Sequence, residues 1–489
     1  MNALSSRLSD PSLLVDKAFI DGQWVDADGG RTFDVTNPSS GEVVCSLPDM
    51  GVAETRRAID AAYVAQKDWA AKTGKERSSV LRRWHDLMVE NADDLGAILT
   101  AEMGKPFAEA KGEILYGASF IEWFAEEAKR VYGDVIPGHQ VDKRIIVLKQ
   151  PVGVVTSITP WNFPNAMIAR KAGPALAVGC SFIAKPAKQT PLSALAMAAL
   201  AERAGLPKGL FSVITSNSST TIGNEFCANE KVRKLTFTGS TEVGRILMKQ
   251  SAEQIMKTSM ELGGNAPFIV FDDADIDAAV EGAMISKYRN NGQTCVCANR
   301  IYVQASVYDD FARKLATAVA KMKIGDGFGE GVTAGPLIDG AALTKVEEHI
   351  ADATSKGATI IAGGKRHALG GTFFEPTVLT GVTKDMAVAT EETFGPVAPL
   401  FRFDTVEDVI EQANDTIFGL ASYFYARDLS RVWRVAEALE YGMVGINTGL
   451  ISTEVAPFGG VKQSGTGREG SKYGVDDYLE IKYVCLGGV

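Results

Sequence analysis

The stretch 290-NNGQTCVCAN-299 places two cysteines two residues apart in a segment rich in Asn, Gly and Gln. A zinc site usually takes three or four ligands, with paired cysteines or paired histidines. The chain offers neither a second cysteine pair nor clustered histidines, so we expect no metal site. Free cysteines also pack as small hydrophobic residues, but the polar lead-in to Cys295 is typical of a loop. The pattern favours a nucleophilic thiol at Cys295.

A nucleophilic thiol needs a stabilised thiolate and a site that holds the oxyanion it creates. The segment 258-TSMELGGNAPFIV-270 places Glu261 between apolar residues and a glycine pair, just before a predicted strand. Apolar surroundings raise the pKa of a carboxyl group, which suits a general base near neutral pH. Most glutamates are solvated, so the pattern alone makes Glu261 no more than a candidate base.

A second glycine-bearing turn lies in 234-KLTFTGSTEVGRILMKQ-250, where a β-branched strand runs into Gly239 and Ser240. A helical pattern with Gly244 in its first turn follows. Unpaired N–H groups at a helix N-terminus attract anions. The segment matches neither the P-loop nor the G-x-G-x-x-G motif, so by itself it leaves a phosphate site and a structural turn equally open.

The elements that would position these residues alternate between strands and helices. Helical patterns cover 76–105, ending at Gly104, and 106–133. Predicted strands follow at 152–164, 181–187, 211–215, 266–271 and 299–304, with helices at 165–178, 192–205 and 278–290. This spacing predicts parallel βαβ units in two α/β lobes.

Two extended segments, 135–150 and 476–489, stand outside both lobes. An exposed strand edge is a liability unless it pairs elsewhere. A peripheral hairpin would explain the pattern, but we favour an arm that pairs with another subunit.

Bulk composition narrows the class of protein. The chain has 489 residues, 46% of them hydrophobic, and a net charge of -10 with scattered basic residues, which argues against nucleic-acid binding. Residues 172–184, a charge-free apolar stretch, are too short to cross a bilayer. We expect no secretory signal and no membrane partner, and the six unevenly placed cysteines indicate a reducing, cytoplasmic location.

Seven motifs occur in order over about 300 residues: 161-WNFP-164, 185-KPA-187, 239-GSTEVG-244, 261-ELGG-264, 292-GQTC-295, 392-ETFGPV-397 and 457-PFGGVKQSG-465. Together they resemble the NAD(P)-dependent aldehyde dehydrogenase superfamily. The resemblance implies an α/β fold with a Rossmann-type cofactor domain (1–132 and 152–263) and an α/β catalytic domain (264–462). It also implies a β-strand oligomerisation arm (133–151 and 475–489), giving a homodimer or homotetramer.

The resemblance implies a role for each motif. Cys295 would attack the aldehyde, with the oxyanion held by the Asn162 amide and the Cys295 backbone N–H, and Glu261 would activate water to hydrolyse the thioester. Lys185 would bind the adenosine ribose, Glu392 the nicotinamide ribose, and Phe394 would pack near the nicotinamide. The implied cofactor residues are Trp161, Lys185, Pro186, Ala187, Lys188, Gly239, Ser240, Gly244, Leu262, Glu392 and Phe394.

Cofactor choice depends on position 188. Many NAD-preferring members carry a glutamate three residues after the lysine that matches Lys185, whereas this chain has Lys188. A lysine cannot accept a hydrogen bond from a ribose hydroxyl, but it can pair with a 2′-phosphate. We predict that NADP is preferred and that NAD use is also open.

The stretches 284–300 and 447–474 are similar to succinate-semialdehyde dehydrogenases and their glutarate-semialdehyde relatives. In that group two arginines and a serine hold the substrate carboxylate, and the matching positions are Arg170, Arg289 and Ser452. The two substrates differ by one methylene, worth about 1–3 kcal/mol in a pocket. We rank succinate semialdehyde first, followed by glutarate semialdehyde and a broader aldehyde range, with a thiol esterase as a remote alternative.

The roles of Cys297 and of residues 216–232 are not decided by the sequence. Cys297 can pair with Cys295 only if the loop brings their Cα atoms within ~7 Å. Resemblance to succinate-semialdehyde dehydrogenases with the same C-V-C suggests a redox partner, and a packing residue is the alternative. Residues 216–232 show no functional pattern.

Overall fold

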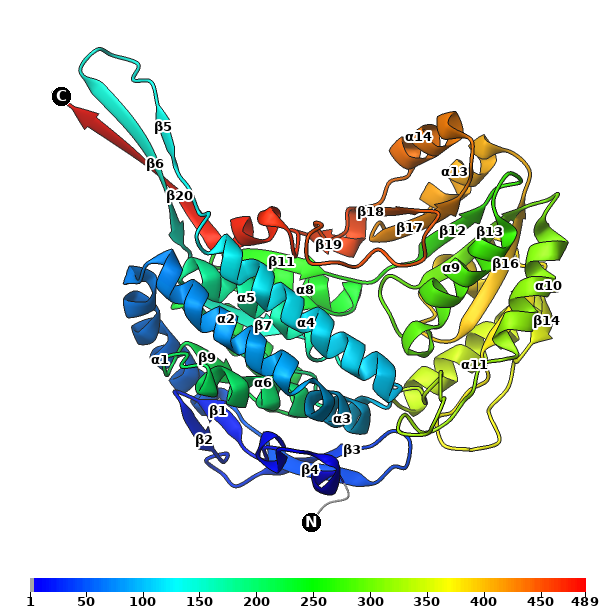
Figure 1. Ribbon diagram of the computed structural model, residues 1–489, viewed down its shortest axis with the longest axis horizontal. Helices are drawn as coiled ribbons and strands as arrows, with labels where there is room; N and C mark the ends of the chain where they lie inside the picture. The colour runs from blue at the N-terminus through cyan, green and yellow to red at the C-terminus, as the bar shows by residue number, and fades with distance from the viewer. Residues whose placement is uncertain (1–3) are drawn as a thin grey trace.

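An eight-stranded sheet forms the centre of the larger lobe in the computed structural model, which describes residues 4–489 (Figure 1). Its strand order is β19-β11-β10-β7-β8-β9-β1-β2, and the five central strands are parallel. The strands are β1 (Ala18–Ile20), β2 (Gln23–Val25), β7 (Val154–Ile158), β8 (Ser181–Lys185), β9 (Phe211–Val213), β10 (Val232–Thr238), β11 (Lys257–Glu261) and β19 (Gly465–Thr466).

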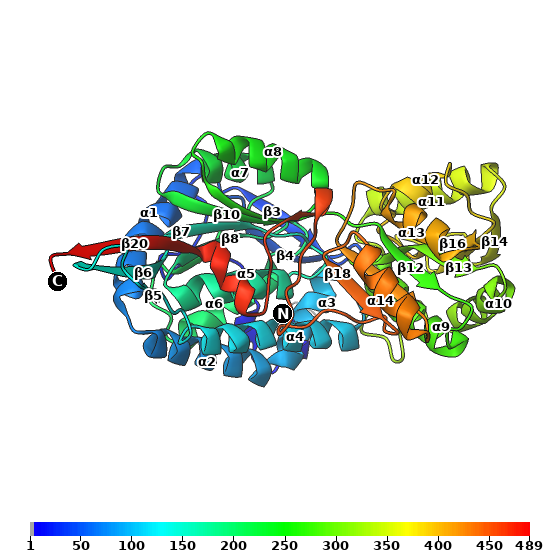
Figure 2. The same ribbon diagram turned by 90° about the horizontal axis from the view of Figure 1, so that it is seen from above.

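Helices cover both faces of this sheet, as the view from above shows (Figure 2). One face carries α1 (Val52–Ala71), α7 (Ser219–Ala228) and α8 (Thr241–Ala252). The other carries α2 (Gly74–Glu90), α3 (Ala92–Met103), α4 (Phe107–Glu127), α5 (Ala166–Val178) and α6 (Leu192–Arg203). A hairpin of β3 (Thr32–Thr36) and β4 (Val43–Pro48) lies below them in Figure 1. Both faces are therefore buried, which explains the nearly continuous apolar runs of the central strands.

The second lobe is built on a seven-stranded sheet, with strand order β14-β15-β16-β13-β12-β17-β18. Its strands are β12 (Ala266–Val270), β13 (Ala298–Gln304), β14 (Thr359–Ala362), β15 (Thr377–Thr380), β16 (Val397–Phe403), β17 (Ala421–Tyr425) and β18 (Met443–Ile446). Its helices are α9 (Ile276–Tyr288), α10 (Tyr308–Val319), α11 (Gly340–Ser355), α12 (Ala387–Thr390), α13 (Val406–Asn414) and α14 (Leu429–Ala438). Only β14, at one edge, runs antiparallel to its neighbour.

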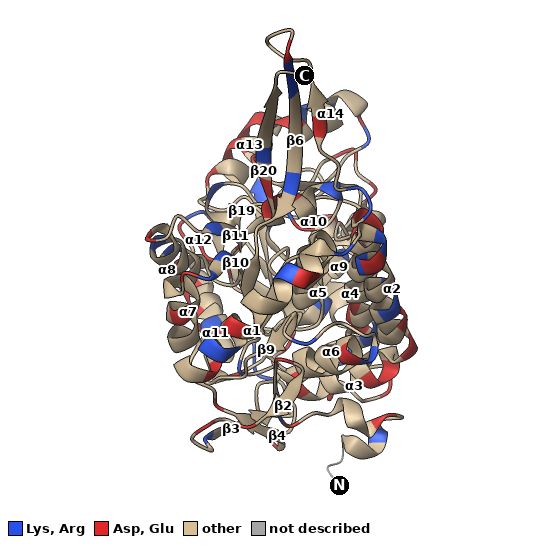
Figure 3. Cartoon of the chain, turned by 90° about the vertical axis from the view of Figure 1, so that its left-hand side faces the viewer, with Lys and Arg blue, Asp and Glu red and all other residues tan. Residues whose placement is uncertain are grey.

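A three-stranded sheet extends away from both lobes (Figures 1 and 3). It contains β5 (Asp134–Ile136), β6 (Lys143–Pro151) and β20 (Leu479–Gly487), so it joins segments more than three hundred residues apart. Pairing runs from Leu479 opposite Pro151 to Gly487 opposite Lys143. Its side chains include the exposed apolar residues Val135, Ile481 and Tyr483.

The predicted βαβ alternation is present in both lobes, but one predicted helix is wrong. The segment 76–105 forms two helices, α2 and α3, because the backbone of Asn91 leaves the helical region at φ −107°. The Asn91 side chain instead donates to the Leu87 carbonyl oxygen, a local bond by which asparagine competes with helix continuation. Gly104 does end α3, in the left-handed conformation at φ 87°.

No helix within residues 4–489 is long and apolar enough to cross a membrane. Acidic and basic residues are interspersed along the ribbon in the view that faces the arm (Figure 3). No cluster of three or more His, Cys, Asp or Glu side chains in the described part of the chain is arranged to hold a metal ion.

Candidate active site

Cys295 lies at the end of a tightly turned loop between α9 and β13. Three successive residues, Asn290, Asn291 and Gly292, have positive φ angles of 51°, 55° and 77°. Such a conformation costs free energy for non-glycine residues and persists only where the surroundings fix it. Buried amides do so, since Asn291 Nδ2 donates to the Gly335 carbonyl oxygen at 2.9 Å and Gln293 Oε1 accepts the Ile338 N–H at 2.9 Å. The loop is therefore held rigidly in front of the nucleophile.

The Cys295 side chain lies where two cavities meet. One, of about 220 Å³, is also lined by Trp161, Asn162 and Glu392, and the other, much smaller, by Arg170 and Arg289. Burial raises the pKa of the Cys295 thiol to about 12, although the nearby Arg170 charge lowers it. The thiol is protonated near neutral pH in this state, so its use as a nucleophile requires a proton acceptor.

Asn162 is tied to the nucleophile loop through buried hydrogen bonds. Its Nδ2 donates to the Gln293 carbonyl oxygen at 3.0 Å. Its own carbonyl oxygen accepts from Asn290 Nδ2 at 3.1 Å and from Lys105 Nζ at 2.8 Å. Lys105 in turn forms a buried ion pair with Glu113 at 2.6 Å. The Asn162 amide is thus fixed against the loop that carries Cys295, as a preorganised oxyanion donor must be.

Glu261 ends β11, at the carboxyl edge of the larger sheet, and its side chain is buried. Burial, reinforced by the nearby Glu469 carboxylate, raises its pKa well above the usual value. Its Oε2 has no hydrogen-bond partner among the described residues. A side chain at Gly459 would stand 3.0 Å from Oε1, so the glycine leaves room for the carboxyl group. A buried carboxyl group of raised pKa next to a thiol is typical of a general base.

A buried charge cluster lies behind Glu261. Arg170 Nη2 is 2.6 Å from Glu469 Oε2, and Lys171 also pairs with Glu469. These cations hold the pKa of Glu469 below its usual value. Glu469 and Lys171 were not predicted from the sequence. The adjacent Arg170 and Lys171 in an otherwise apolar helix could have indicated a buried acidic partner, because two buried cations require an anion.

A groove of about 500 Å³ runs along the carboxyl end of β10 and the start of α8. Its lining includes Ala187, Lys188, Asn217, Ser219 and Gly239. Pro160, Thr238 and Gly239 also line the cavity at Cys295, so the two spaces are adjacent. Ligands bind open α/β sheets at this edge. Residues 216–232, without a functional pattern in the sequence, thus supply part of the groove.

Two lysines of opposite exposure lie at this groove. Lys185 is buried, donates to Ser219 Oγ at 2.8 Å, and has a pKa lowered by burial to about 8. Lys188 is exposed, and its charge lowers the Lys185 pKa further. Lys188 lines the groove, whereas Lys185 lines neither the groove nor the cavity at Cys295 and contacts the groove through Ser219. The exposed Lys188 ammonium suits an anionic ligand in the groove, such as a nicotinamide dinucleotide.

The other predicted cofactor residues fall into two sets. Trp161, Gly239, Ser240, Leu262, Glu392 and Phe394 line the cavity at Cys295, whereas Pro186 and Gly244 line neither space. Gly244 instead permits close packing, since a Cβ there would be 2.5 Å from Leu262 Cδ2. Burial raises the pKa of Glu392 to about 7, and one of its oxygens accepts the Gly264 N–H at 3.2 Å. The Trp161 and Phe394 rings meet edge to face at 5.5 Å.

Arg170, Arg289 and Ser452 come together in the small pocket on the other side of Cys295, with Tyr116, Phe163 and Phe458. The Arg170 guanidinium lies over Phe458, 4.2 Å from the ring centroid, and Arg289 over Phe163 at 5.2 Å. Aromatic walls of this kind orient a guanidinium while excluding water. The three residues named for substrate binding are therefore neighbours, although they are distant in sequence.

Cys297 faces elsewhere. Both Cys295 and Cys297 are free thiols, but Cys297 is fully buried and lines neither cavity. Its sulfur donates to the Lys287 carbonyl oxygen at 3.2 Å. A disulfide with Cys295 would have to break this bond, so the redox role stays a prediction while the packing role has a visible contact.

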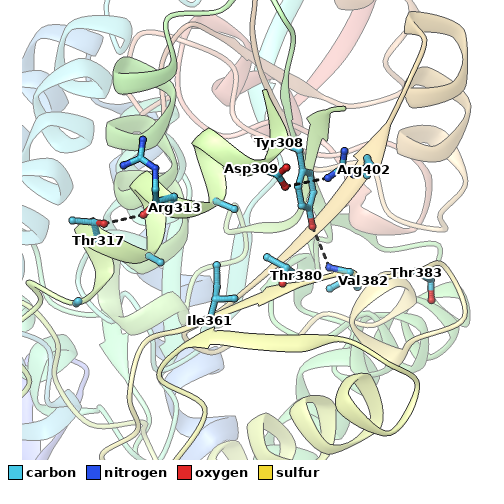
Figure 4. Close-up of a pocket in the computed structure, with 13 residues that line it drawn as sticks. Tyr308, Asp309, Arg313, Thr317, Ile361, Thr380, Val382, Thr383 and Arg402 are labelled. Carbon is cyan, nitrogen blue, oxygen red and sulfur yellow. Dashed lines mark hydrogen bonds and ion pairs between the residues drawn. The ribbon is translucent and has the colours of Figure 1, made fainter. Parts of the chain in front are cut away.

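A hollow of about 1140 Å³ lies on the outside of the second lobe between α10 and the strands β14 and β15 (Figure 4). None of its lining residues lines the spaces at Cys295. Its polar groups are paired with one another, as in the Arg402–Asp309 ion pair at 3.1 Å and the bond from Gly381 N to Tyr308 Oη. It lacks the reactive and unpaired groups that gather around Cys295.

A half-buried cysteine between a groove of about 500 Å³ and a small pocket is the arrangement of an enzyme with a cysteine nucleophile. Residues 24–484 match the model of the aldehyde dehydrogenase family. The chain belongs to this family.

Several relatives match over nearly the full length. The chain is 68% identical to the glutarate-semialdehyde dehydrogenase of Pseudomonas aeruginosa, over 99% of this chain and 100% of that protein. It is 65% identical to the succinate-semialdehyde dehydrogenase (NADP(+)) GabD of Escherichia coli, over 98% and 100%. A crystal structure of succinate-semialdehyde dehydrogenase from Burkholderia pseudomallei superposes with a TM-score of 0.97 at 65% identity, covering 98% of this chain and 99% of that chain.

Proposed function

We propose that this aldehyde dehydrogenase oxidises succinate semialdehyde to succinate with NADP+ as the preferred cofactor and NAD+ as an alternative. The observation that carries the proposal is the small pocket in which Arg170, Arg289 and Ser452 adjoin Cys295. A guanidinium binds a carboxylate through two parallel hydrogen bonds. Glutarate semialdehyde is the second candidate, because relatives at 68% identity are named for it.

The chemistry divides between three residues. The Cys295 sulfur bonds to the aldehyde carbon as its proton is released through water to solvent, and the oxyanion receives hydrogen bonds from Asn162 Nδ2 and the Cys295 N–H. NADP+ held in the groove would supply the hydride acceptor for this carbon, and Cys295 would then carry the product as a thioester. Glu261 then removes a proton from water as its oxygen bonds to the carbonyl carbon, and the carbon–sulfur bond breaks to release the acid.

The cofactor would lie along the groove and the adjacent cavity. Lys185 and Ser219 face the adenosine ribose, Lys188 the 2′-phosphate, and Glu392 the nicotinamide ribose. Support comes from the buried Lys185–Ser219 hydrogen bond and from the exposed Lys188 ammonium beside it. The turn from Gly239 to Gly244 would hold the phosphates at the start of α8.

Reversing the charge at Lys188 should change cofactor preference. In Lys188→Glu the carboxylate repels a 2′-phosphate and can accept a hydrogen bond from a 2′-hydroxyl. A charge-assisted bond is worth about 1.5–3 kcal/mol, so the ratio of kcat/KM for NADP+ over NAD+ should fall by about tenfold or more. Lys208→Glu, the same change at an exposed lysine outside the groove, is the control. An unchanged ratio in Lys188→Glu would exclude the phosphate contact.

Substrate class is tested by kcat/KM for succinic semialdehyde, glutaric semialdehyde and butanal. We expect either semialdehyde to exceed butanal by at least tenfold, about 1.4 kcal/mol of transition-state discrimination. The ratio between the semialdehydes then decides which is the better substrate. If butanal reacts equally well, Arg170, Arg289 and Ser452 do not bind a carboxylate, although the enzyme remains an aldehyde dehydrogenase.

We also propose that the arm, residues 133–151 and 475–489, pairs with a second copy of the chain to give a homodimer or homotetramer. The cofactor domain would comprise residues 1–132 and 152–263, and the catalytic domain residues 264–462. The arm exposes apolar side chains, with Val135 83% and Ile481 73% accessible, and such side chains are stabilised by burial against a partner. We further propose that the enzyme is cytoplasmic, acts on a small-molecule substrate and has no nucleic-acid or membrane partner.

A further inference from the structure

Tyr116 is a residue of the substrate pocket to which no motif points. It lies in α4, and its ring packs edge to face on Phe120 with centroids 5.0 Å apart. Its side chain lines the pocket shared by Arg170, Arg289 and Ser452. The ring is thus anchored in the core of the larger lobe while its polar end reaches the pocket.

The Tyr116 hydroxyl is buried and makes no hydrogen bond of good geometry with the described residues. Arg170 lies close enough to donate to its oxygen, which leaves the Tyr116 proton without an acceptor. An unsatisfied buried hydroxyl costs about 1–3 kcal/mol, so such groups in native proteins call for an explanation. Burial raises the pKa of Tyr116, with the neighbouring Arg170 charge lowering it in part. The group therefore keeps its proton at neutral pH and is free to donate to an acceptor that enters the pocket.

The charges around this hydroxyl favour an anion. Arg170 is compensated by Glu469 at 2.6 Å, so much of its charge is already neutralised. Arg289 forms no direct ion pair with the residues that the structure describes, although Glu109 is near enough to feel its charge, and the Phe163 ring lies beside it. A guanidinium without a direct ion pair and a hydroxyl with a free proton on the same small pocket match a carboxylate, which has about four acceptor positions to fill.

We propose that Tyr116 donates a hydrogen bond to the free carboxylate of the substrate, beside Arg289, and so helps the enzyme select acidic aldehydes over uncharged ones. The proposal rests on the proposed semialdehyde substrate. It assigns unequal roles to the two arginines: Arg289 and Tyr116 contact the carboxylate, and Arg170 adds a charge that Glu469 partly offsets.

The test is Tyr116→Phe, which keeps the ring and its contact with Phe120. The measurement is kcat/KM for succinic semialdehyde and for butanal with the same cofactor. The value for succinic semialdehyde should fall by about tenfold or more, and the value for butanal should change less than twofold. Ser119→Ala is the matched control, because Ser119 lies one turn further along α4 and bonds the Tyr116 carbonyl oxygen from outside the pocket. Thermal melting should be alike in all three proteins.

An equal semialdehyde-to-butanal ratio in wild type and Tyr116→Phe would overturn the role of Tyr116. If the wild type prefers semialdehydes while that ratio is unchanged in the variant, the proposed function stands without Tyr116. If the wild type shows no preference, the proposed substrate class fails and the role of Tyr116 fails with it.

Discussion

Cys295→Ala should lose aldehyde oxidation almost completely, with kcat reduced by more than about 10⁴-fold, as expected when a covalent nucleophile is removed. Without the sulfur no thiohemiacetal forms, and the pocket can only hold an aldehyde beside the cofactor. The substitution removes one sulfur from a side chain that borders two cavities, so folding should be little affected. The measurement is the rate of NADPH formation with succinic semialdehyde, together with a thermal melt.

Cys297→Ser provides the matched control, since it changes the neighbouring thiol. Its sulfur contacts the Lys287 carbonyl oxygen, and a serine hydroxyl can keep that bond. Activity without oxidant should remain within a few-fold of wild type. Loss of activity in Cys297→Ser together with activity in Cys295→Ala would reverse the assignment of the two cysteines.

The reactive residues could be predicted from the sequence because each sits in a local motif. Cys295 follows a polar loop, Asn162 a strand end, and Glu261 a strand that stops at a glycine pair. Their shared role was implied by the family resemblance, and parallel strands deliver such residues to one edge of a sheet. The structure adds that Asn162 and the Cys295 loop are bonded directly through Gln293.

The residues that sequence analysis missed owe their roles to packing between distant segments. Glu469 is paired with Arg170 and Lys171, about three hundred residues away, and no local pattern around it indicates burial. Tyr116 lies on α4, whose buried positions are mostly apolar core residues, so nothing local distinguishes it. The break at Asn91 was missed for a different reason, because apolar spacing continues through it and only a side-chain bond ends the helix.

Glu261→Gln should separate the two halves of the reaction. If the carboxylate is needed mainly to activate water, the variant forms the thioester and stops, giving a burst of NADPH equal to the number of active sites. The following steady-state rate should be reduced by about 10²–10⁴-fold, the usual contribution of a general base. Stopped-flow fluorescence of NADPH measures both phases, and Glu253→Gln, an exposed glutamate at the end of α8, is the control.

The pH dependence gives the same assignment a second test. Glu261 must be deprotonated to accept a proton from water, and burial raises its pKa well above the usual value. Wild-type kcat should therefore rise with pH through that raised pKa and fall at lower pH as the carboxyl group becomes protonated. Glutamine does not titrate, so the steady-state rate of Glu261→Gln should not show this rise with pH. If Glu261→Gln keeps both the wild-type steady-state rate and its rise with pH, another group is the base. Glu392, whose pKa burial raises to about 7, would then be tested next.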